Sequence, residues 1–267
     1  MKKLKVMTVF GTRPEAIKMA PLVLELKKYP EIDSYVTVTA QHRQMLDQVL
    51  DAFHIKPDFD LNIMKERQTL AEITSNALVK LDELFKNIKP DIVLVHGDTT
   101  TTFAGSLAAF YHQIAVGHVE AGLRTGNKYS PFPEELNRQM TGAIADLHFA
   151  PTGQAKDNLL KENKKADSIF VTGNTAIDAL NTTVRDGYSH PVLDQVGEDK
   201  MILLTAHRRE NLGEPMENMF KAIRRIVVEF EDVQVVYPVH LNPVVREAAH
   251  KHFGDSDRVH LIEPLEV

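Results

Sequence analysis

Acidic residues that could move protons follow several predicted strands of this chain. Asp98 comes directly after one strand, Glu120 closes the next, and Glu134 opens a helix soon afterwards. Carboxylates that are buried close together raise one another's pKa, which suits proton transfer near neutral pH. Two simpler explanations stay open. Asp98 could cap the Thr-rich helix that follows it, and Glu134 could form a surface ion pair with Arg138 at i,i+4.

Basic residues occupy two further strand ends. Residues 11–14 lead from the first strand into a helix that carries Lys18, and Arg13 stands at its start. The turn has one glycine, so it lacks the three of the dinucleotide fingerprint. The helix N-terminus and the two cations could bind a phosphate or carboxylate, or this could be an ordinary helix start with proline in the first turn. His207, with Arg208 beside it, follows a later strand and could hold a diphosphate and protonate a leaving oxygen, or form a solvated basic turn.

A metal site is a further interpretation of the same strand ends. His96, Asp98, His118 and Glu120 are residue types that bind metals, and a dinuclear phosphoesterase would be the matching enzyme class. Such a site also needs Asp or His ligands on the first strand and a later Asn-His pair. The first strand offers neither ligand, and residues 173–175 read Gly-Asn-Thr. The sequence therefore favours a site without metal.

The elements that must position these residues alternate between strands and helices. The predicted strands are Lys5–Phe10, Ser34–Ala40, Asp91–His96, Ile114–Glu120, Leu147–Ala150 and Ile169–Thr172. The predicted helices are Ala16–Lys28, Gln44–Phe53, Leu70–Asn87, Thr101–Tyr111, Glu134–Ala145 and Gly153–Glu162. Pro21 should kink or restart the first helix. This alternation predicts a parallel sheet whose ligands bind beyond the carboxyl ends of the strands.

A second series of elements begins after residues 184–199, which we interpret as an interdomain linker. The series consists of strands Met201–Thr205, Val233–Pro238 and Val259–Ile262, with helices near Pro215–Glu231 and Pro243–Phe253. We expect a first domain at 1–183 and the start of a second domain at 200–267. A domain of this kind usually spans ~100–150 residues, so the second domain is expected to be incomplete.

Composition limits the class of protein. Of 267 residues, 43% are hydrophobic and 25% charged, a soluble globular profile. No apolar run approaches the ~20 residues of a membrane span, and the first residues do not form a signal peptide. The chain has no cysteine, which excludes disulfides, thiolate catalysis and cysteine zinc sites and fits a cytoplasmic location. A net charge of −6 without a basic stripe argues against a nucleic-acid partner.

Six segments taken together resemble a known family, the non-hydrolysing UDP-N-acetylglucosamine 2-epimerases of bacteria. The segments are FGTRPEAIK at 10–18, HGDT at 96–99, HVEAGLR at 118–124, PFPEELNR at 131–138, GNT at 173–175 and HRREN at 207–211. They span the chain in the family's order. The resemblance implies an α/β fold of two Rossmann-like domains that face each other across a cleft (GT-B type). The family's Ser-Gly-Gly stretch and downstream glutamate, which hold the nucleotide, are absent here, so the second domain is expected to be truncated.

The resemblance also implies a reaction and its residues. The family interconverts UDP-N-acetylglucosamine and UDP-N-acetylmannosamine, eliminating UDP to a 2-acetamidoglucal and adding it back, and needs no cofactor. It supplies ManNAc for cell-surface polysaccharide. The implied catalytic residues are Asp98, Glu120, Glu134, His207, Lys18 and Arg138, and the implied substrate-binding residues are Arg13, Lys18, Asp98, Glu120 and His207. Which carboxylate removes the C2 proton stays open.

A second bound UDP-N-acetylglucosamine can activate members of this family allosterically. The matching positions are Gln41, His42, Gln44, Arg67, Glu134, Arg208 and His240. By the same resemblance we expect a homodimer, with no nucleic-acid or membrane partner. Two alternatives remain: a hydrolysing epimerase, which releases ManNAc and UDP, and a nucleotide-sugar-binding fragment without activity.

Overall fold

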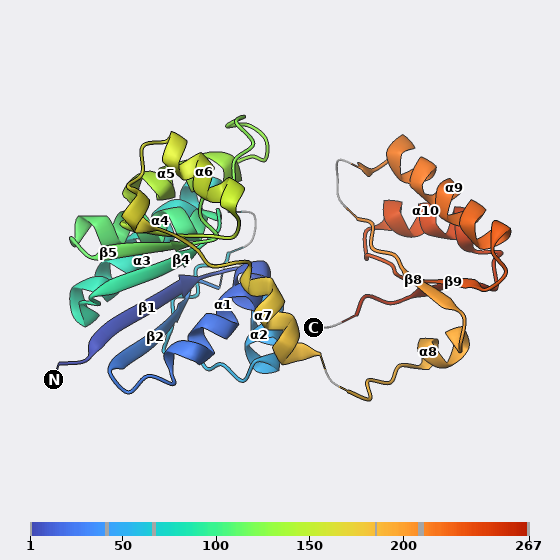
Figure 1. Ribbon diagram of the computed structural model, residues 1–267, viewed down its shortest axis with the longest axis horizontal. Coiled ribbons are helices and arrows are strands. Elements are labelled where there is room, and N and C mark those ends of the chain that lie inside the picture. The colour runs from blue at the N-terminus through green and yellow to red at the C-terminus, as the bar shows by residue number, and fades with distance from the viewer. Residues whose placement is uncertain (1, 41–42, 66–67, 185, 208–210, 266–267) are drawn as a thin grey trace. The chain divides into compact units, whose positions relative to one another are not determined.

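The computed structural model describes residues 2–40, 43–65, 68–184, 186–207 and 211–265. The chain divides into two compact units, residues 1–184 and 185–267, each built on its own sheet (Figure 1). Residues 184–199, predicted to be a linker, mostly belong to the second unit and contain a short helix, α8 (Pro191–Val196). That helix forms because His190 caps its first turn, and it packs through Val192 and Val196 against Val236.

The first unit contains a seven-stranded parallel sheet in the order β3-β2-β1-β4-β5-β6-β7. Its strands are β1 (Leu4–Phe10), β2 (Ile32–Val38), β3 (Phe59–Asp60), β4 (Ile92–His96), β5 (Ala115–Val119), β6 (Leu147–Ala150) and β7 (Ile169–Val171). Along the chain, β1, β2 and β3 lie in order toward one edge of the sheet, and β4, β5, β6 and β7 lie in order toward the other edge. The strand order therefore reverses between β1 and β4, and doubly wound sheets bind ligands at such a switch point.

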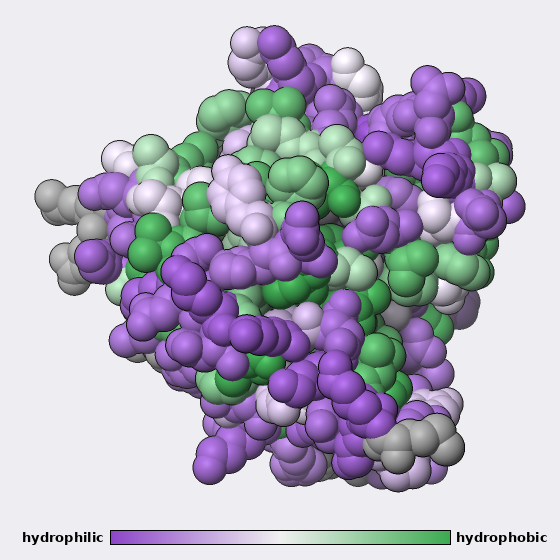
Figure 2. Space-filling model, turned by 90° about the vertical axis from the view of Figure 1, so that its left-hand side faces the viewer, coloured by the Kyte–Doolittle hydropathy of each residue, from purple (hydrophilic) through white to green (hydrophobic). Residues whose placement is uncertain are grey.

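Helices connect these strands and cover the sheet. They are α1 (Arg13–Leu26), α2 (Arg43–Ala52), α3 (Leu70–Ile88), α4 (Thr100–Tyr111), α5 (Glu134–Ile144), α6 (Gly153–Lys161) and α7 (Thr175–Thr183). Helix α1 contacts α2 and α7, whereas α4 contacts α3 and α5, so two separate helical groups pack on the sheet (Figure 1). Figure 2 shows one face of the molecule, where hydrophilic side chains surround separate hydrophobic patches.

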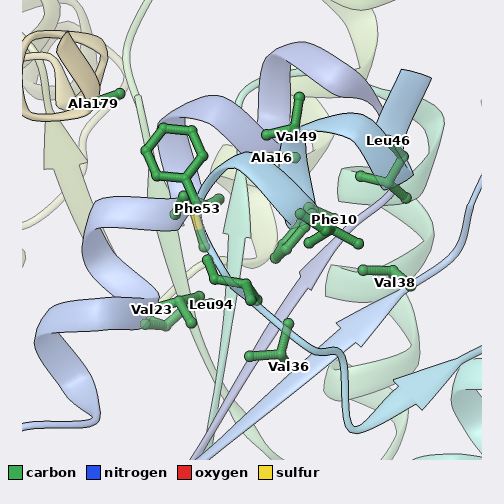
Figure 3. Close-up of a cluster of buried hydrophobic side chains, with 14 of the residues drawn as sticks. Phe10, Ala16, Val23, Val36, Val38, Leu46, Val49, Phe53, Leu94 and Ala179 are labelled. Atoms are coloured by element: carbon green, nitrogen blue, oxygen red, sulfur yellow. The ribbon is translucent and has the colours of Figure 1, made fainter. Parts of the chain in front are cut away.

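The core beside α1 shows why these elements form. Strand residues such as Phe10 and Val36 are fully buried against α1 and α2 residues such as Val23 and Leu46 (Figure 3). Ala179 of α7 joins the same cluster. Burying a large aliphatic or aromatic side chain stabilises the fold by about 1.5–3 kcal/mol. The strand ends that carry polar residues are thus fixed by a packed core directly beneath them.

Helix α1 differs from its prediction. It begins at Arg13 and continues through Pro21 to Leu26 as one helix, so Pro21 neither ends nor restarts it. Proline removes one intrahelical hydrogen bond. The helix tolerates this loss because Met19, Ala20 and Val23 are buried on either side of the proline.

The second unit contains a three-stranded parallel sheet in the order β10-β9-β8. Its strands are β8 (Lys200–Leu203), β9 (Val233–Pro238) and β10 (Val259–Ile262), and its longer helices are α9 (Glu214–Glu229) and α10 (Pro243–Phe253). Phe220 of α9 and Phe253 of α10 pack against Tyr237 of β9 in its core. The Tyr237 hydroxyl donates a 2.7 Å hydrogen bond to the Ala206 carbonyl and so anchors the loop after β8. Among the described residues of the chain, no helix is long and apolar enough to cross a membrane.

Candidate functional site

The site in the first unit lies where β1, β4 and β5 end, on both sides of the switch point (Figure 1). The predicted residues Lys18 and Glu120 form an ion pair there, with 2.5 Å between Lys18 Nζ and Glu120 Oε2. Arg138 Nη2 lies 3.4 Å from Asp98 Oδ2. Four residues that are distant in sequence thus become two cation–carboxylate pairs at one edge of the sheet.

Glu120 adopts an unusual backbone conformation. It follows β5 directly, and its φ of 63° lies in the left-handed region. For a residue other than glycine this conformation costs on the order of 1–3 kcal/mol and often marks a functional site. Its side chain is only 12% exposed although it carries a carboxylate.

Asp98 lies in the loop between β4 and α4. The N-cap of α4 is Thr99, whose side chain accepts a hydrogen bond from the Thr102 backbone, so the capping role considered for Asp98 is wrong. Burial raises the pKa of Asp98; Arg138 opposes this shift, and the carboxylates of Glu134 and Glu120 add to it. Glu134 and Glu120 are therefore close enough to Asp98 to act on its charge.

Residues in the first turns of α5 contact Asp98. The Asn137 side-chain amide donates a 3.0 Å hydrogen bond to the Asp98 carbonyl. Arg138 is 8% exposed and pairs with Asp98 and with Glu135, at 3.3 Å, rather than forming the predicted surface pair with Glu134. That prediction failed because the helix turns Arg138 toward the sheet edge instead of toward solvent.

Glu135 is a residue that sequence reasoning missed. It is fully buried, and its carboxylate accepts hydrogen bonds from the backbone N–H groups of Thr125 and Gly126. Burial opposes ionisation of Glu135, but these bonds and one from Gln139 outweigh it and hold its pKa below the ordinary value. Glu135 thereby fixes the loop that follows Arg124. Its only sequence signal was its place in the first turn of a helix.

Two backbone N–H groups of the turn after β1 have an acceptor within the chain. The N–H groups of Gly11 and Thr12 donate to Glu15 Oε2, at 3.0 and 2.7 Å, so the chain's own carboxylate occupies the expected anion position. Thr12 and Glu15 form a capping box, which the T-x-x-E pattern could have revealed. Glu15 Oε1 also accepts a hydrogen bond from the Thr99 hydroxyl at 2.7 Å.

Arg13 and Lys18 remain as the cations of this turn. Arg13 is the first residue of α1, and its side chain has no hydrogen bond or ion pair within the described part of the chain. A free guanidinium beside a helix N-terminus is suited to bidentate binding of a phosphate. The charges of these two side chains remain for an anionic ligand, although Glu15 occupies two of the backbone donors.

The histidines of β4 and β5 do not form a metal cluster. His118 Nε2 lies 2.7 Å from the Gly97 carbonyl oxygen, so this nitrogen carries the proton and donates it. Burial lowers the pKa of both His96 and His118 to about 3. Across the described ranges no group of three or more His, Asp or Glu side chains could hold a metal ion.

The second unit holds the remaining described residues of the prediction. The rings of His207 and His240 stack at 5.1 Å between centroids and 11° between planes, each in the loop after a strand, β8 or β9. Both side chains are exposed. Gln41, His42, Arg67 and Arg208 lie outside the described residues. Gln44 belongs to α2, but its side chain is also outside the description.

Comparison with known proteins gives one consistent result. The family model described as UDP-N-acetylglucosamine 2-epimerase matches residues 24–267. A protein of Bacillus subtilis (strain 168) named UDP-N-acetylglucosamine 2-epimerase is 99% identical over 267 residues, which are 100% of this chain and 70% of that protein. A crystal structure of a UDP-N-acetylglucosamine 2-epimerase has 96% identity and a TM-score of 0.89, with 100% of this chain and 70% of that one covered.

A structure with bound ligand is also similar. The UDP-GlcNAc 2-epimerase of Neisseria meningitidis, solved bound to UDP-GlcNAc, is 52% identical with a TM-score of 0.86, and the match covers 98% of this chain and 73% of that one. Together with the parallel sheets of the two units, these likenesses confirm the expected α/β fold of Rossmann-like domains of the GT-B type.

Proposed function

Because the chain belongs to the UDP-N-acetylglucosamine 2-epimerase family, we propose that it interconverts UDP-N-acetylglucosamine and UDP-N-acetylmannosamine. The observation that carries this proposal is the pair of cation–carboxylate contacts, Lys18 with Glu120 and Arg138 with Asp98, at the switch point of the sheet. They provide proton-transfer groups and positive charge in one place, and both are needed to invert a carbon that bears an unactivated hydrogen.

The chemistry explains why elimination is required. The hydrogen on C2 of the sugar is not next to a carbonyl, so removing it alone would leave an unstabilised carbanion. If a carboxylate takes this proton while the C1–O bond breaks, the electron pair forms the C1–C2 double bond and UDP leaves with the bonding electrons. Re-addition of UDP to C1, with a proton delivered to the other face of C2, gives the epimer. No electrons are gained or lost overall, so the reaction requires no redox cofactor.

Asp98, Glu120 and Glu134 are the proposed acid–base residues. Burial raises the pKa of Asp98, which brings this carboxyl closer to the range in which a group both accepts and returns a proton at neutral pH. Before the ligand binds, Arg138 and Lys18 orient Asp98 and Glu120 through their ion pairs.

Arg13, Lys18 and His207 are the proposed ligands of the diphosphate. Arg13 has no competing partner among the described residues, and His207 is exposed after β8. His207 would donate a proton to the oxygen of the departing UDP and so stabilise the leaving group.

Regulation and assembly are further parts of the proposal. A second UDP-GlcNAc would act as an allosteric activator through Gln41, His42, Gln44, Arg67, Glu134, Arg208 and His240. The stacking of the His240 ring on the His207 ring supports this proposal.

We also infer a homodimer in the cytoplasm that provides ManNAc for surface polysaccharide. Exposed apolar side chains such as Phe110 and Tyr111, 59% and 60% exposed, are compatible with a contact between copies.

Incubation of the chain with UDP-GlcNAc in D₂O, followed by proton NMR, tests the activity. We expect UDP-ManNAc to appear and deuterium to replace the hydrogen at C2 in both sugars. Accumulation of free UDP and ManNAc would instead indicate a hydrolysing epimerase. Measurable binding of UDP-GlcNAc without turnover or exchange would contradict the proposal and indicate a binding module.

A further inference from the structure

His96 is a buried side chain whose two ring nitrogens have no hydrogen-bond partner in the described ranges. It is the last residue of β4 and is 3% exposed. A buried polar group without a partner destabilises the fold, and such groups in native proteins usually have an explanation. The mechanism above does not use this side chain.

The nearest functional group is the carboxylate of Glu120. His96 Nε2 lies 3.9 Å from Glu120 Oε2, the oxygen that also pairs with Lys18 Nζ at 2.5 Å. The gap is too long for a hydrogen bond, and about 1 Å of side-chain movement would close it. Glu120 Oε2 thus has the Lys18 ammonium group beside it and the His96 ring as a second donor within reach.

These two neighbours differ in mobility. Lys18 has a flexible four-carbon stem, its side chain is 25% exposed, and it lies on α1 close to Arg13, the other proposed ligand of the diphosphate. An anionic ligand would compete with Glu120 for its ammonium group. The His96 side chain is 4% exposed and fixed in the sheet, so it cannot follow the ligand.

We propose that His96 is a positioning residue for Glu120, donating an Nε2–H hydrogen bond to its carboxylate when Lys18 turns to the bound nucleotide sugar. The inference rests on the proposed function and extends it to a residue outside the proposed catalytic set. Glu120 needs such support because its left-handed backbone and its position at the strand end leave the carboxylate held by Lys18 alone among the described residues.

The charge state of His96 suits this task. Burial, with the charge of Lys18 adding to it, lowers the pKa of His96 to about 3, so the ring is neutral and carries one N–H. The other titratable group facing it from β5, besides Glu120, is His118, whose pKa is also lowered to about 3. A neutral donor orients a carboxylate without cancelling its charge, so Glu120 keeps its ability to accept a proton.

The tautomer of His96 is the first test. NMR spectra of ¹⁵N-histidine-labelled chain, with His96 assigned through the His96→Gln variant, should show a neutral ring protonated at Nε2 at pH 7. Addition of UDP should shift this Nε2 resonance in the wild type and leave it unshifted in Glu120→Ala. A ring protonated at Nδ1, or an equal response in Glu120→Ala, would overturn the proposal.

Kinetics give the second test. His96→Phe fills the space without a donor, and we expect kcat to fall about 10- to 100-fold with KM changed less than about twofold. His96→Gln keeps an N–H at a similar reach and should recover most of the lost rate. His148→Phe is the matched control, because His148 is also a buried histidine with an unpartnered Nδ1 but lies on β6 outside the proposed site; it should keep the wild-type kcat.

The outcomes separate the two proposals. Wild-type kcat in folded His96→Phe, or no recovery in His96→Gln, would refute the role of His96 while leaving the epimerase intact. A wild-type chain without turnover would refute the proposed function, and the NMR result would then decide on His96. If His96→Phe does not fold, as judged by circular dichroism, the tautomer measurement decides in the same way.

Discussion

The contact between Lys18 and Glu120 joins the first helix of the chain to the end of β5. Both side chains are mostly buried, at 25% and 12% exposure. Lys28, just beyond the end of α1, pairs with Glu25 of that helix at a similar distance, 2.6 Å, but the two side chains are 68% and 52% exposed. Exposed pairs contribute little to stability because water screens their charges, so Lys28 is a suitable comparison for Lys18.

Replacing Lys18 by methionine should lower kcat/KM at least about tenfold, because a charged contact in a partly buried site is lost along with a ligand of the diphosphate. Lys28→Met should keep the wild-type value. Initial rates of UDP-ManNAc formation measure both. Equal rates in the two variants would mean that Lys18 has no part in the reaction.

At the scale of elements, Glu15 connects two loops that carry site residues. Its carboxylate accepts hydrogen bonds from Gly11 and Thr12, at the start of α1, and from Thr99, at the start of α4. Thr99 is adjacent to Asp98. The capping box was visible in the sequence, but the bond to Thr99, 84 positions away, was not, since nothing in a local pattern indicates which loop lies beside another.

Glu15→Ala should lower the free energy of unfolding by at least about 2 kcal/mol, because it leaves buried donors without an acceptor. The matched control is Glu72→Ala. Glu72 forms the same capping box with Thr69 at the start of α3, but in an exposed position, where water replaces the lost carboxylate and the cost should be smaller. Urea unfolding measures both values, and an equal loss in the two variants would contradict the connecting role of Glu15.

At the scale of the whole molecule, three buried histidines make the first unit sensitive to acid. Burial lowers the pKa of His96 and His118 to about 3 and that of His148 to about 4. The unfolded value is about 6.5, so between these values the unfolded chain binds more protons than the folded one. Because the folded state keeps these rings neutral, their contribution to the free energy of unfolding is complete above pH 6.5 and is lost as the pH falls toward 4.

Thermal unfolding between pH 7.5 and 5 should therefore show falling stability below pH 6.5. Each histidine contributes a slope of up to about 1.4 kcal/mol per pH unit. His148→Leu should flatten the dependence by one such contribution. Burial raises the pKa of Glu15 and Asp98, and these two carboxyl groups make stability rise as the pH falls, opposite to the histidines. The difference between the curves of the variant and the wild type therefore decides the prediction. Parallel curves for His148→Leu and the wild type would contradict this account.

Much of this molecule could be predicted from its sequence, because strands and helices follow local periodicity. Strand β6 was predicted with its observed bounds, and β1 within one residue. The two-residue strand β3 and the six-residue helix α8 were missed, since they have too few residues to show a period. Helix α7 was also missed, although its nine residues are as many as those of α6, which was predicted. The contacts of Arg138 with Asp98 and Glu135 required the packed fold, because they depend on how α5 lies against the sheet edge.

We infer that the carboxylates beside this sheet edge exchange the hydrogen at C2 of a UDP-N-acetylhexosamine. The test is the rate of deuterium incorporation at C2 from D₂O in the wild type, Asp98→Asn and Glu120→Gln. The control is Asp33→Asn, because Asp33 is a partly exposed residue that pairs with Lys3. Both site variants should lose at least about 100-fold of the wild-type rate, and Asp33→Asn should lose none. Wild-type exchange in both site variants would contradict the account.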